Sequence, residues 1–296
     1  MGLQEIQKKP ALEVSEEERQ ICDLQDNGVD YGGLESLHYL GNYRRDLPVN
    51  ISRMMENAHD WEHLPFVHPS AFAAIELIDS GSWGWRTKVA LPGTGETQLI
   101  QLLVDNEQNY WATTVLSGSG QGVHIHTQAT PISDNSINVD VRFYLEDQPD
   151  SEEMAAMSLA YLQSLYAQLY DEDQILMEGR QQALDRRLLG DRSGLEELDL
   201  GTIDQLEQSL PHVFEFDGSR FCINRLAGQW VAYAATCPHL LGPLEQAAVE
   251  EDGSVSCPWH GYRFDIKSGT NLDGKCKNLP PAPQIIERSG HVLAQP

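Results

Sequence analysis

Two short loops in the C-terminal third of the chain carry paired cysteine and histidine residues. The stretch CPH contributes Cys237 and His239, and the stretch CPWHG contributes Cys257 and His260, with seventeen residues between the two groups. Two thiolates and two imidazoles could bind one zinc ion tetrahedrally. They could also hold a [2Fe–2S] cluster, with the thiolates on one iron and the imidazoles on the other. The spacing therefore predicts a metal centre. Whether it is a zinc site or a [2Fe–2S] cluster has to be judged from the surrounding residues.

A second set of candidate ligands lies in the stretch ENAHDWEHLPFVHPSAF, which holds three histidines. His59, Glu62 and His63 spell H-x-x-E-H, a zinc peptidase signature in which two histidines on one helical face bind zinc. Asp60, His63 and His68 spell D-x-x-H-x-x-x-x-H, which suggests iron instead. The two hypotheses share His63 and differ in its partner.

The composition limits the classes of partner. The chain has 296 residues, enough for two domains, and its formal net charge is −25 at pH 7. Such an acidic surface would repel nucleic acid and anionic membranes, and no apolar run approaches the roughly 18 residues of a membrane span. The N-terminal stretch MGLQEIQKKP lacks the apolar segment of a signal peptide, and the five cysteines form no dense disulfide pattern. We therefore expect a cytoplasmic protein that binds neither nucleic acid nor a membrane.

The region from residue 82 to residue 145 predicts an antiparallel sheet. Its five β-prone runs are separated by turn compositions such as LPGTGE and SGSGQ, and they are SWGWRTKVAL, TQLIQLLVD, YWATTVL, GVHIHTQAT and SINVDVRFYL. His124 and His126 lie two apart on the fourth run and so face one side. We expect them to be a packed or exposed pair rather than ligands. Residues 31–44, ahead of the sheet, predict a helical patch.

A long helix is predicted from residue 151 to about residue 189. Apolar residues recur there every three or four positions, among them Met154, Met157 and Tyr161. A curved antiparallel sheet gripping one long helix is a helix-grip, or START-like, architecture with an internal pocket. We expect this domain to cover residues 1–195.

The remainder of the chain predicts a small all-β domain over residues 200–296. Residues 190–205 read as a linker, and the short runs HVFEFDG, SRFCINRL and QWVAYAAT that follow predict strands. The expected fold class is therefore α+β, with a helix-grip domain followed by a small all-β domain.

The segments CPHLLGPL and CPWHGYRFDIKSG resemble the two cluster-binding loops of Rieske domains. Gly242, Pro243 and Gly261 would let the backbone approach a cluster and donate N–H groups to its sulfur atoms. Leu241 and Trp259 stand where respiratory Rieske proteins carry an additional cysteine, so the resemblance is to the ferredoxin and oxygenase type. It implies a [2Fe–2S] cluster held by Cys237, His239, Cys257 and His260.

In the Rieske non-haem iron oxygenases, a mononuclear iron held by two histidines and a carboxylate accepts the electrons. That family's signature, E-N-x-x-D-x-x-H-x-x-x-x-H, is similar to ENAHDWEHLPFVH here. The resemblance implies that His63 and His68 bind Fe(II). It also implies that Asp60 joins one of these rings to a cluster histidine of a neighbouring subunit. Pro65 interrupts a helix between the histidines and can re-aim His68, whereas the H-x-x-E-H hypothesis needs an uninterrupted helix.

The third ligand is expected on the long helix. The family has an aspartate followed five residues later by a glutamate, and YDEDQILMEG offers Asp173 and Glu178 in that relation. Asp173 is the predicted ligand. Asp171 is the rival, because one shift of helical register could present it instead.

The resemblance implies a Rieske mono- or dioxygenase. It would use O2, and electrons relayed from the cluster to Fe(II), to hydroxylate or oxidatively demethylate a small organic substrate. A ferredoxin or a flavin-dependent reductase would supply the electrons, and the assembly would be a homotrimer. The family's usual order places the Rieske domain first, whereas here it follows the catalytic part. The alternatives are a non-enzymatic Rieske electron carrier fused to a ligand-binding helix-grip domain, and a zinc hydrolase.

Overall fold

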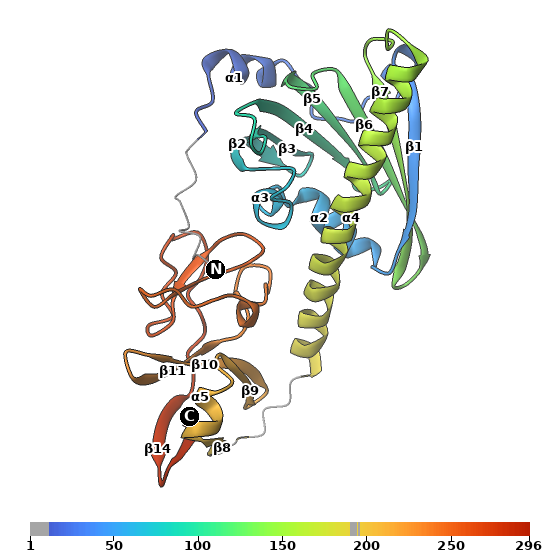
Figure 1. Ribbon diagram of the computed structural model, residues 1–296. Helices are drawn as coiled ribbons and strands as arrows, with labels where there is room; N and C mark the ends of the chain where they lie inside the picture. The colour runs from blue at the N-terminus through green and yellow to red at the C-terminus, as the bar shows by residue number, and fades with distance from the viewer. Residues whose placement is uncertain (1–11, 190–193, 195) are drawn as a thin grey trace. The chain divides into compact units, whose positions relative to one another are not determined.

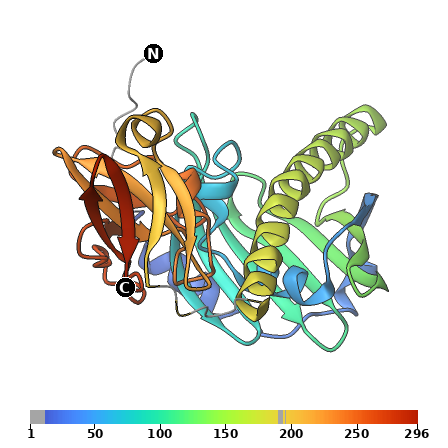
Figure 2. The ribbon, with the colours of Figure 1, turned by 90° about the horizontal axis from the view of Figure 1, so that it is seen from below.

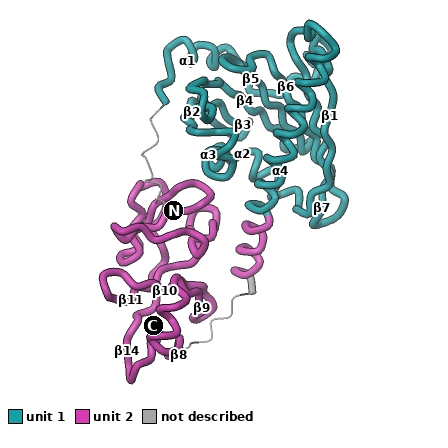
Figure 3. Tube along the Cα trace, in the orientation of Figure 1, with its two compact units in different colours: residues 1–177 teal, residues 178–296 magenta. Residues whose placement is uncertain are grey.

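The computed structural model describes residues 12–189, 194 and 196–296, and the chain divides into two compact units (Figures 1 and 3). Unit 1 covers Met1–Met177 and unit 2 covers Glu178–Pro296. The division falls inside the long helix α4 (Glu152–Leu189), ahead of the boundary predicted from the sequence.

Unit 1 is built on one seven-stranded antiparallel sheet with the order β1-β7-β6-β5-β4-β3-β2. Its strands are β1 (His38–Leu47), β2 (Ala74–Gly81), β3 (Gly84–Ala90), β4 (Thr97–Asp105), β5 (Tyr110–Gly118), β6 (Val123–Ser133) and β7 (Ser136–Leu145). The five predicted runs become β3 to β7, so the predicted sheet and the α+β class are confirmed.

The predicted helical patch at residues 31–44 was wrong. Only a 3-10 turn, η1 (Gly33–Ser36), forms there, and β1 takes most of the segment. β1 pairs along its length with β7, and Arg44 and Asn42 of β1 both donate hydrogen bonds to Asp140 of β7. This pairing with a strand about one hundred residues away outweighs the local helical pattern.

α4 runs across one face of this sheet (Figures 1 and 2). Tyr166 of α4 packs edge-on against Phe143 of β7, with ring centroids 5.4 Å apart. Gly41 of β1 lets the helix approach, because a Cβ there would lie 2.6 Å from the Leu159 side chain. The predicted helix is confirmed, but Met154, Met157 and Tyr161 of its apolar stripe are exposed, so the first turns of that stripe do not pack on the sheet.

Besides α4, residues 12–177 of unit 1 form three short α-helices: α1 (Glu16–Asp23), α2 (Ile51–His59) and α3 (Leu64–Val67). α2 begins where the Asn50 side chain accepts a hydrogen bond from the backbone N–H of Arg53, a typical N-cap. It ends at His59. Pro65 lies in the first turn of α3, where its missing N–H costs nothing.

Unit 2 beyond α4 contains three small antiparallel sheets with the orders β11-β10-β9, β12-β13 and β14-β15-β8. Its elements are β8 (Leu198–Thr202), α5 (Ile203–Glu207), β9 (His212–Phe216), β10 (Ser219–Leu226), β11 (Gln229–Ala234), η2 (Leu244–Gln246), β12 (Ser254–Ser256), β13 (Arg263–Asp265), β14 (Gln284–Arg288) and β15 (His291–Gln295). The predicted small β domain is confirmed.

The predicted linker at residues 190–205 was wrong over its last part. β8 and α5 occupy residues 198–205, because β8 pairs with β15 at the far end of the chain. Residues 190–193 and 195 of that prediction lie outside the described residues. Among the helices in the described ranges, none combines the length and the apolar character of a membrane span.

Candidate metal centres

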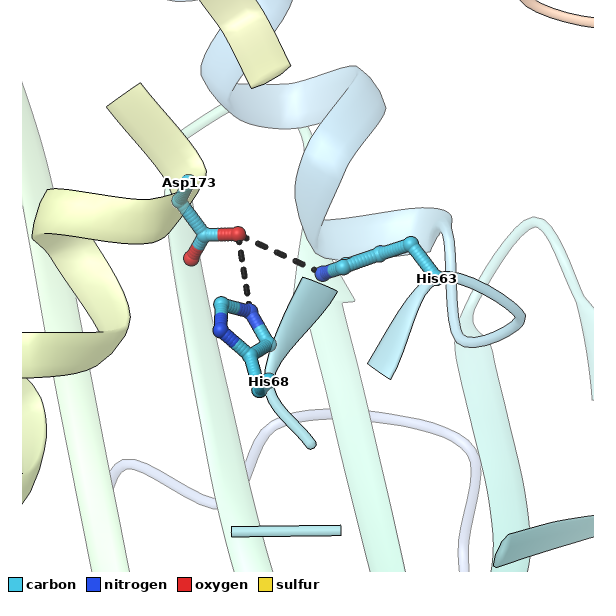
Figure 4. A group of neighbouring side chains, drawn as sticks. All are labelled: His63, His68 and Asp173. Atoms are coloured by element: carbon cyan, nitrogen blue, oxygen red, sulfur yellow. Dashed lines mark hydrogen bonds and ion pairs between the residues drawn. The ribbon is translucent and has the colours of Figure 1, made fainter. Parts of the chain in front are cut away.

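His63, His68 and Asp173 converge on one point in unit 1 (Figure 4). All three are buried, and their candidate ligand atoms lie within 4.8 Å of one another. Asp173 Oδ1 is 3.3 Å from His63 Nε2 and 3.0 Å from His68 Nε2. Two imidazoles and one carboxylate facing a common point match the donor set of a non-haem iron site.

The two histidines meet because they flank the single turn of α3. His63 precedes the helix and His68 follows it, and the carbonyl of His63 accepts hydrogen bonds from the N–H groups of Phe66 and Val67. Pro65 sits inside this turn, so the chain reverses between the ligands instead of continuing α2. Asp173 reaches the same point from the middle of α4.

Each histidine also faces a second carboxylate through its other ring nitrogen. His68 Nδ1 lies 2.7 Å from Glu172 Oε2, and His63 Nδ1 lies 3.6 Å from Asp60 Oδ2. Glu172 Oε1 in turn accepts a hydrogen bond from Gln168, one turn earlier on α4. Such outer carboxylates fix the tautomer and the direction of a metal-binding imidazole. Glu172 was not assigned a role from the sequence. Its only signal was its position directly before Asp173.

The electrostatics of this cluster favour a cation. A carboxylate accepts hydrogen bonds and donates none, so the Nδ1–H of His68 points to Glu172 and its bare Nε2 faces another acceptor, Asp173 Oδ1. Burial disfavours the charged ring of His63, but Asp173 and Asp60 outweigh burial and raise its pKa to about 10. Burial would raise the pKa of Asp173, yet its two histidine partners lower it. A metal ion between the three groups supplies the positive charge that these carboxylates stabilise, so the residues present fit one.

The rival ligands lie elsewhere. Asp171 is exposed and forms an ion pair with Arg45 at 2.6 Å. His59 ends α2 and faces Asn106 at 3.4 Å, and α2 does not continue to His63. The uninterrupted helix that the H-x-x-E-H hypothesis requires is therefore absent from this described segment, and that hypothesis was wrong.

His124 and His126 form packed pairs away from this cluster. His126 is buried on β6, and its Nδ1 lies 2.9 Å from the hydroxyl of Tyr110. His124 lies 3.2 Å from Glu146. Both are structural partners within the sheet, as expected.

In unit 2, the two cysteine and histidine loops have the same backbone form. In the first, the N–H of Leu241 donates to the carbonyl of Cys237. In the second, the N–H of Gly261 donates to the carbonyl of Cys257. Leu241 and Gly261 have positive φ angles of 65° and 67°. Gly261 adopts this conformation without strain, whereas Leu241 does so as a buried non-glycine residue.

These two loops bring the four predicted cluster residues together. The His239 and His260 rings meet edge to face with centroids 4.6 Å apart, and the Cys237 and Cys257 thiols share a hydrogen bond. That shared hydrogen bond raises the pKa of the Cys237 thiol and lowers the pKa of the Cys257 thiol.

The backbone approaches the cysteine sulfur atoms closely at Gly242, as the sequence predicted. A Cβ at Gly242 would lie 2.6 Å from Cys257 Sγ, so only glycine leaves room there for the sulfur. Buried paired thiols with two adjacent imidazoles provide the donor set of a Rieske-type cluster, which these residues fit.

Comparisons with known proteins agree with the second centre. Residues 196–289 match the Rieske [2Fe-2S] domain family. Over 82 residues, this chain is 33% identical to pheophorbide a oxygenase, chloroplastic, of Oryza sativa subsp. japonica, an alignment that covers 27% of this chain and 14% of that protein. It is 25% identical over 103 residues to the alkene monooxygenase system ferredoxin component of Xanthobacter autotrophicus (strain ATCC BAA-1158 / Py2), covering 35% of this chain and 84% of that protein. The C-terminal segment is therefore a Rieske domain, related to oxygenase-associated ferredoxins, whose [2Fe–2S] cluster transfers electrons.

Solved structures similar to each part are known. The ferredoxin of carbazole 1,9a-dioxygenase from Nocardioides aromaticivorans IC177 covers 34% of this chain and 99% of its own, with 23% identity and a TM-score of 0.32. A START superfamily protein from Mycobacterium smegmatis covers 46% of this chain and 95% of its own, with 12% identity and a TM-score of 0.37.

Proposed function

We propose that this chain is a Rieske non-haem iron mono- or dioxygenase that acts on a small organic molecule. The observation that carries the proposal is the convergence of His63, His68 and Asp173 on one buried point in a chain that also contains a Rieske domain. Neither part alone implies an oxygenase. Together they provide an electron carrier and a candidate site for O2 chemistry in one polypeptide.

The geometry supports an assignment of the residues that would hold the two groups. His63, His68 and Asp173 would hold Fe(II), and the cluster would be held by Cys237, His239, Cys257 and His260. When bound, the cluster and the ferrous ion supply one-electron transfer and the activation of O2.

The protein residues orient and enclose this site. Glu172 accepts the Nδ1–H of His68 and keeps that ring's Nε2 free of a proton, which is the form that binds a metal. The Asp60 carboxylate faces the corresponding nitrogen of His63. A cavity with a largely apolar wall lies beside the three ligands, which are themselves buried.

Asp60 is proposed to serve electron transfer between the centres rather than metal binding. It lines the cavity and lies 3.6 Å from His63 Nδ1 on the side opposite Asp173. The proposal includes a homotrimeric assembly and a ferredoxin or flavin-dependent reductase as electron donor.

A single-turnover experiment tests the function. The cluster is reduced chemically under anaerobic conditions, and 18O2 is added with an excess of a small phenolic compound that carries a methoxy group. The proposal expects 18O in an organic product, or release of a demethylated product, and loss of this turnover in His63→Ala with the cluster absorbance intact. Equal product from His63→Ala would contradict it.

A second function, a non-enzymatic Rieske electron carrier fused to a ligand-binding domain, is favoured by one comparison. The similarity to the alkene monooxygenase ferredoxin component covers 84% of that protein, so the Rieske segment corresponds to most of a free-standing carrier. A carrier would bind its ligand without consuming O2, and it would hold iron only in its cluster.

A further inference from the structure

The side chains that line the cavity beside the candidate iron site indicate which kind of ligand it can bind. Its volume is about 120 Å³, and most of its lining side chains are apolar or aromatic. Those from the sheet and from the segment after α3 include Phe72, Trp85, Ile100, Leu102 and Trp111. Apolar walls of this kind stabilise an apolar body by removing it from water.

The charge of the cavity excludes an anionic ligand. Among the described residues that line it, there is no lysine or arginine, and the ionisable side chains are Asp60, Asp173, two histidines and two tyrosines. The two carboxylates offset the charge of a divalent cation at the site. A ligand carboxylate would therefore lose its hydration at a site whose carboxylates already balance the charge of the cation.

The size of the cavity suits about one ring. An engineered apolar cavity of about 150 Å³ binds benzene. A cavity of about 120 Å³ is in the same range, and a second fused ring would exceed this volume.

Among the described residues of the wall, one buried polar atom outside the His63 ring lacks a hydrogen-bond partner. Asn57 Oδ1 is buried on the cavity side of α2, and within the described residues it makes no hydrogen bond. The hydroxyl of Thr113, which also lines the cavity, is already paired with Tyr166. A buried amide oxygen without a partner is costly, and a ligand hydroxyl or N–H would satisfy it.

We propose that this cavity binds a small uncharged molecule of about one ring, with an apolar body and one hydroxyl or N–H group that donates a hydrogen bond to Asn57. The identification of this molecule as the substrate rests on the proposed function. The binding itself does not, because it requires neither O2 nor turnover.

Anaerobic titration calorimetry on the full chain, with its metals in place, tests this inference at pH 7. The probes are phenol, anisole, benzoate and 1-naphthol, and phenol is uncharged at this pH. Phenol should bind most tightly. Anisole, which lacks a donor, should bind about tenfold more weakly because Asn57 remains unpaired. Benzoate and 1-naphthol should bind at least as weakly as anisole. Equal affinity for phenol and anisole, or tighter binding of benzoate or 1-naphthol, would overturn the inference.

Two variants locate the binding site in this cavity. Asn57→Leu keeps the side-chain size and should reduce the preference for phenol over anisole to less than about twofold. The matched control is Asn135→Leu, in the exposed turn between β6 and β7, which should keep the preference of the parent protein. Leu102→Ala should admit 1-naphthol by enlarging the cavity, which gives an independent result even if Asn57→Leu does not fold. An unchanged preference in folded Asn57→Leu, or unchanged exclusion of 1-naphthol in folded Leu102→Ala, would reject the site.

If phenol binds as described while the chain neither activates O2 nor holds mononuclear iron, the proposed function fails and the ligand inference stands. If product forms from phenol-like and benzoate-like molecules alike, the function stands and the ligand inference fails.

Discussion

Replacing Glu172 should weaken metal binding at the candidate iron site without removing a ligand. Glu172 accepts a 2.7 Å hydrogen bond from His68 Nδ1, which is short enough for a charge-assisted bond. Glu172→Gln keeps the size and an acceptor oxygen but removes the charge that makes the ring more basic. Removing such an outer partner typically lowers metal affinity by about 10- to 100-fold.

The structure places the expected effect within this range. The Glu172 side chain is 27% exposed, so solvent screens part of its charge. We therefore expect about a tenfold loss for Glu172→Gln, or about 1.4 kcal/mol. Glu172→Ala also removes the hydrogen bond and should approach a hundredfold loss.

The assay is an anaerobic titration with Co(II) against a chelator of known affinity, on protein stripped of its mononuclear metal with the cluster left in place. The visible bands of bound Co(II) report whether the same ligands remain. Asp171→Asn is the matched control, because it removes the same charge from the same helix at an exposed residue paired with Arg45. It should leave the affinity unchanged. The reasoning would be refuted if all three variants bound Co(II) within twofold of the affinity of the parent protein. Equal losses of Co(II) affinity in Glu172→Gln and Asp171→Asn would also refute it.

Three further predictions concern other parts of the chain. Burial lowers the pKa of His126 to about 4, so as pH falls below about 6.5 the unfolded state takes up the proton first, and the free energy of unfolding should decrease until about pH 4. In urea unfolding, His126→Gln should lose this part of the pH dependence of the free energy of unfolding. An unchanged pH dependence would exclude His126 as its source. Gly242→Ala should sharply lower the [2Fe–2S] content, measured by visible absorbance per chain, because the alanine Cβ would lie 2.6 Å from the sulfur of Cys257. Gly28→Ala is the control, because a Cβ at Gly28 would lie in open space. Equal absorbance in both variants would count against the cluster position. Asp60→Asn should keep the mononuclear metal but slow reoxidation of the reduced cluster by O2 in stopped flow, whereas loss of that metal would make Asp60 a binding residue.

The Rieske loops could be predicted from the sequence because each is local. Within each loop, five consecutive residues supply the cysteine, the histidine and the turn, so the sequence of each loop was enough to show its resemblance to a cluster-binding loop. The positive φ of Leu241 could not be predicted in this way, because nothing in its residue type indicates it.

Only some residues of the candidate iron site lie close together in the sequence. His63 and His68 are separated by one turn around Pro65, and the sequence places both. Asp173 lies more than one hundred residues later and was proposed through a family resemblance. Glu172 acquires its role only from the rotation of α4, which sets which of two adjacent acids faces each side of His68.

The errors in the predicted fold have long-range causes. β1 resembles a helix locally and becomes a strand by pairing with β7. β8 resembles a linker and becomes a strand by pairing with β15. In α4, periodicity identifies the helix, but its packing through Tyr166 and Leu159 depends on Phe143 and Gly41, which belong to distant strands.

The most direct test of the central claim is the iron and acid-labile sulfide content of the anaerobically purified chain, compared with that of Asp173→Ala. The account predicts about three iron and two sulfide ions per chain in the parent protein, and about two iron and two sulfide ions in the variant. Two iron ions per chain in both proteins, or zinc in place of the third iron, would contradict it.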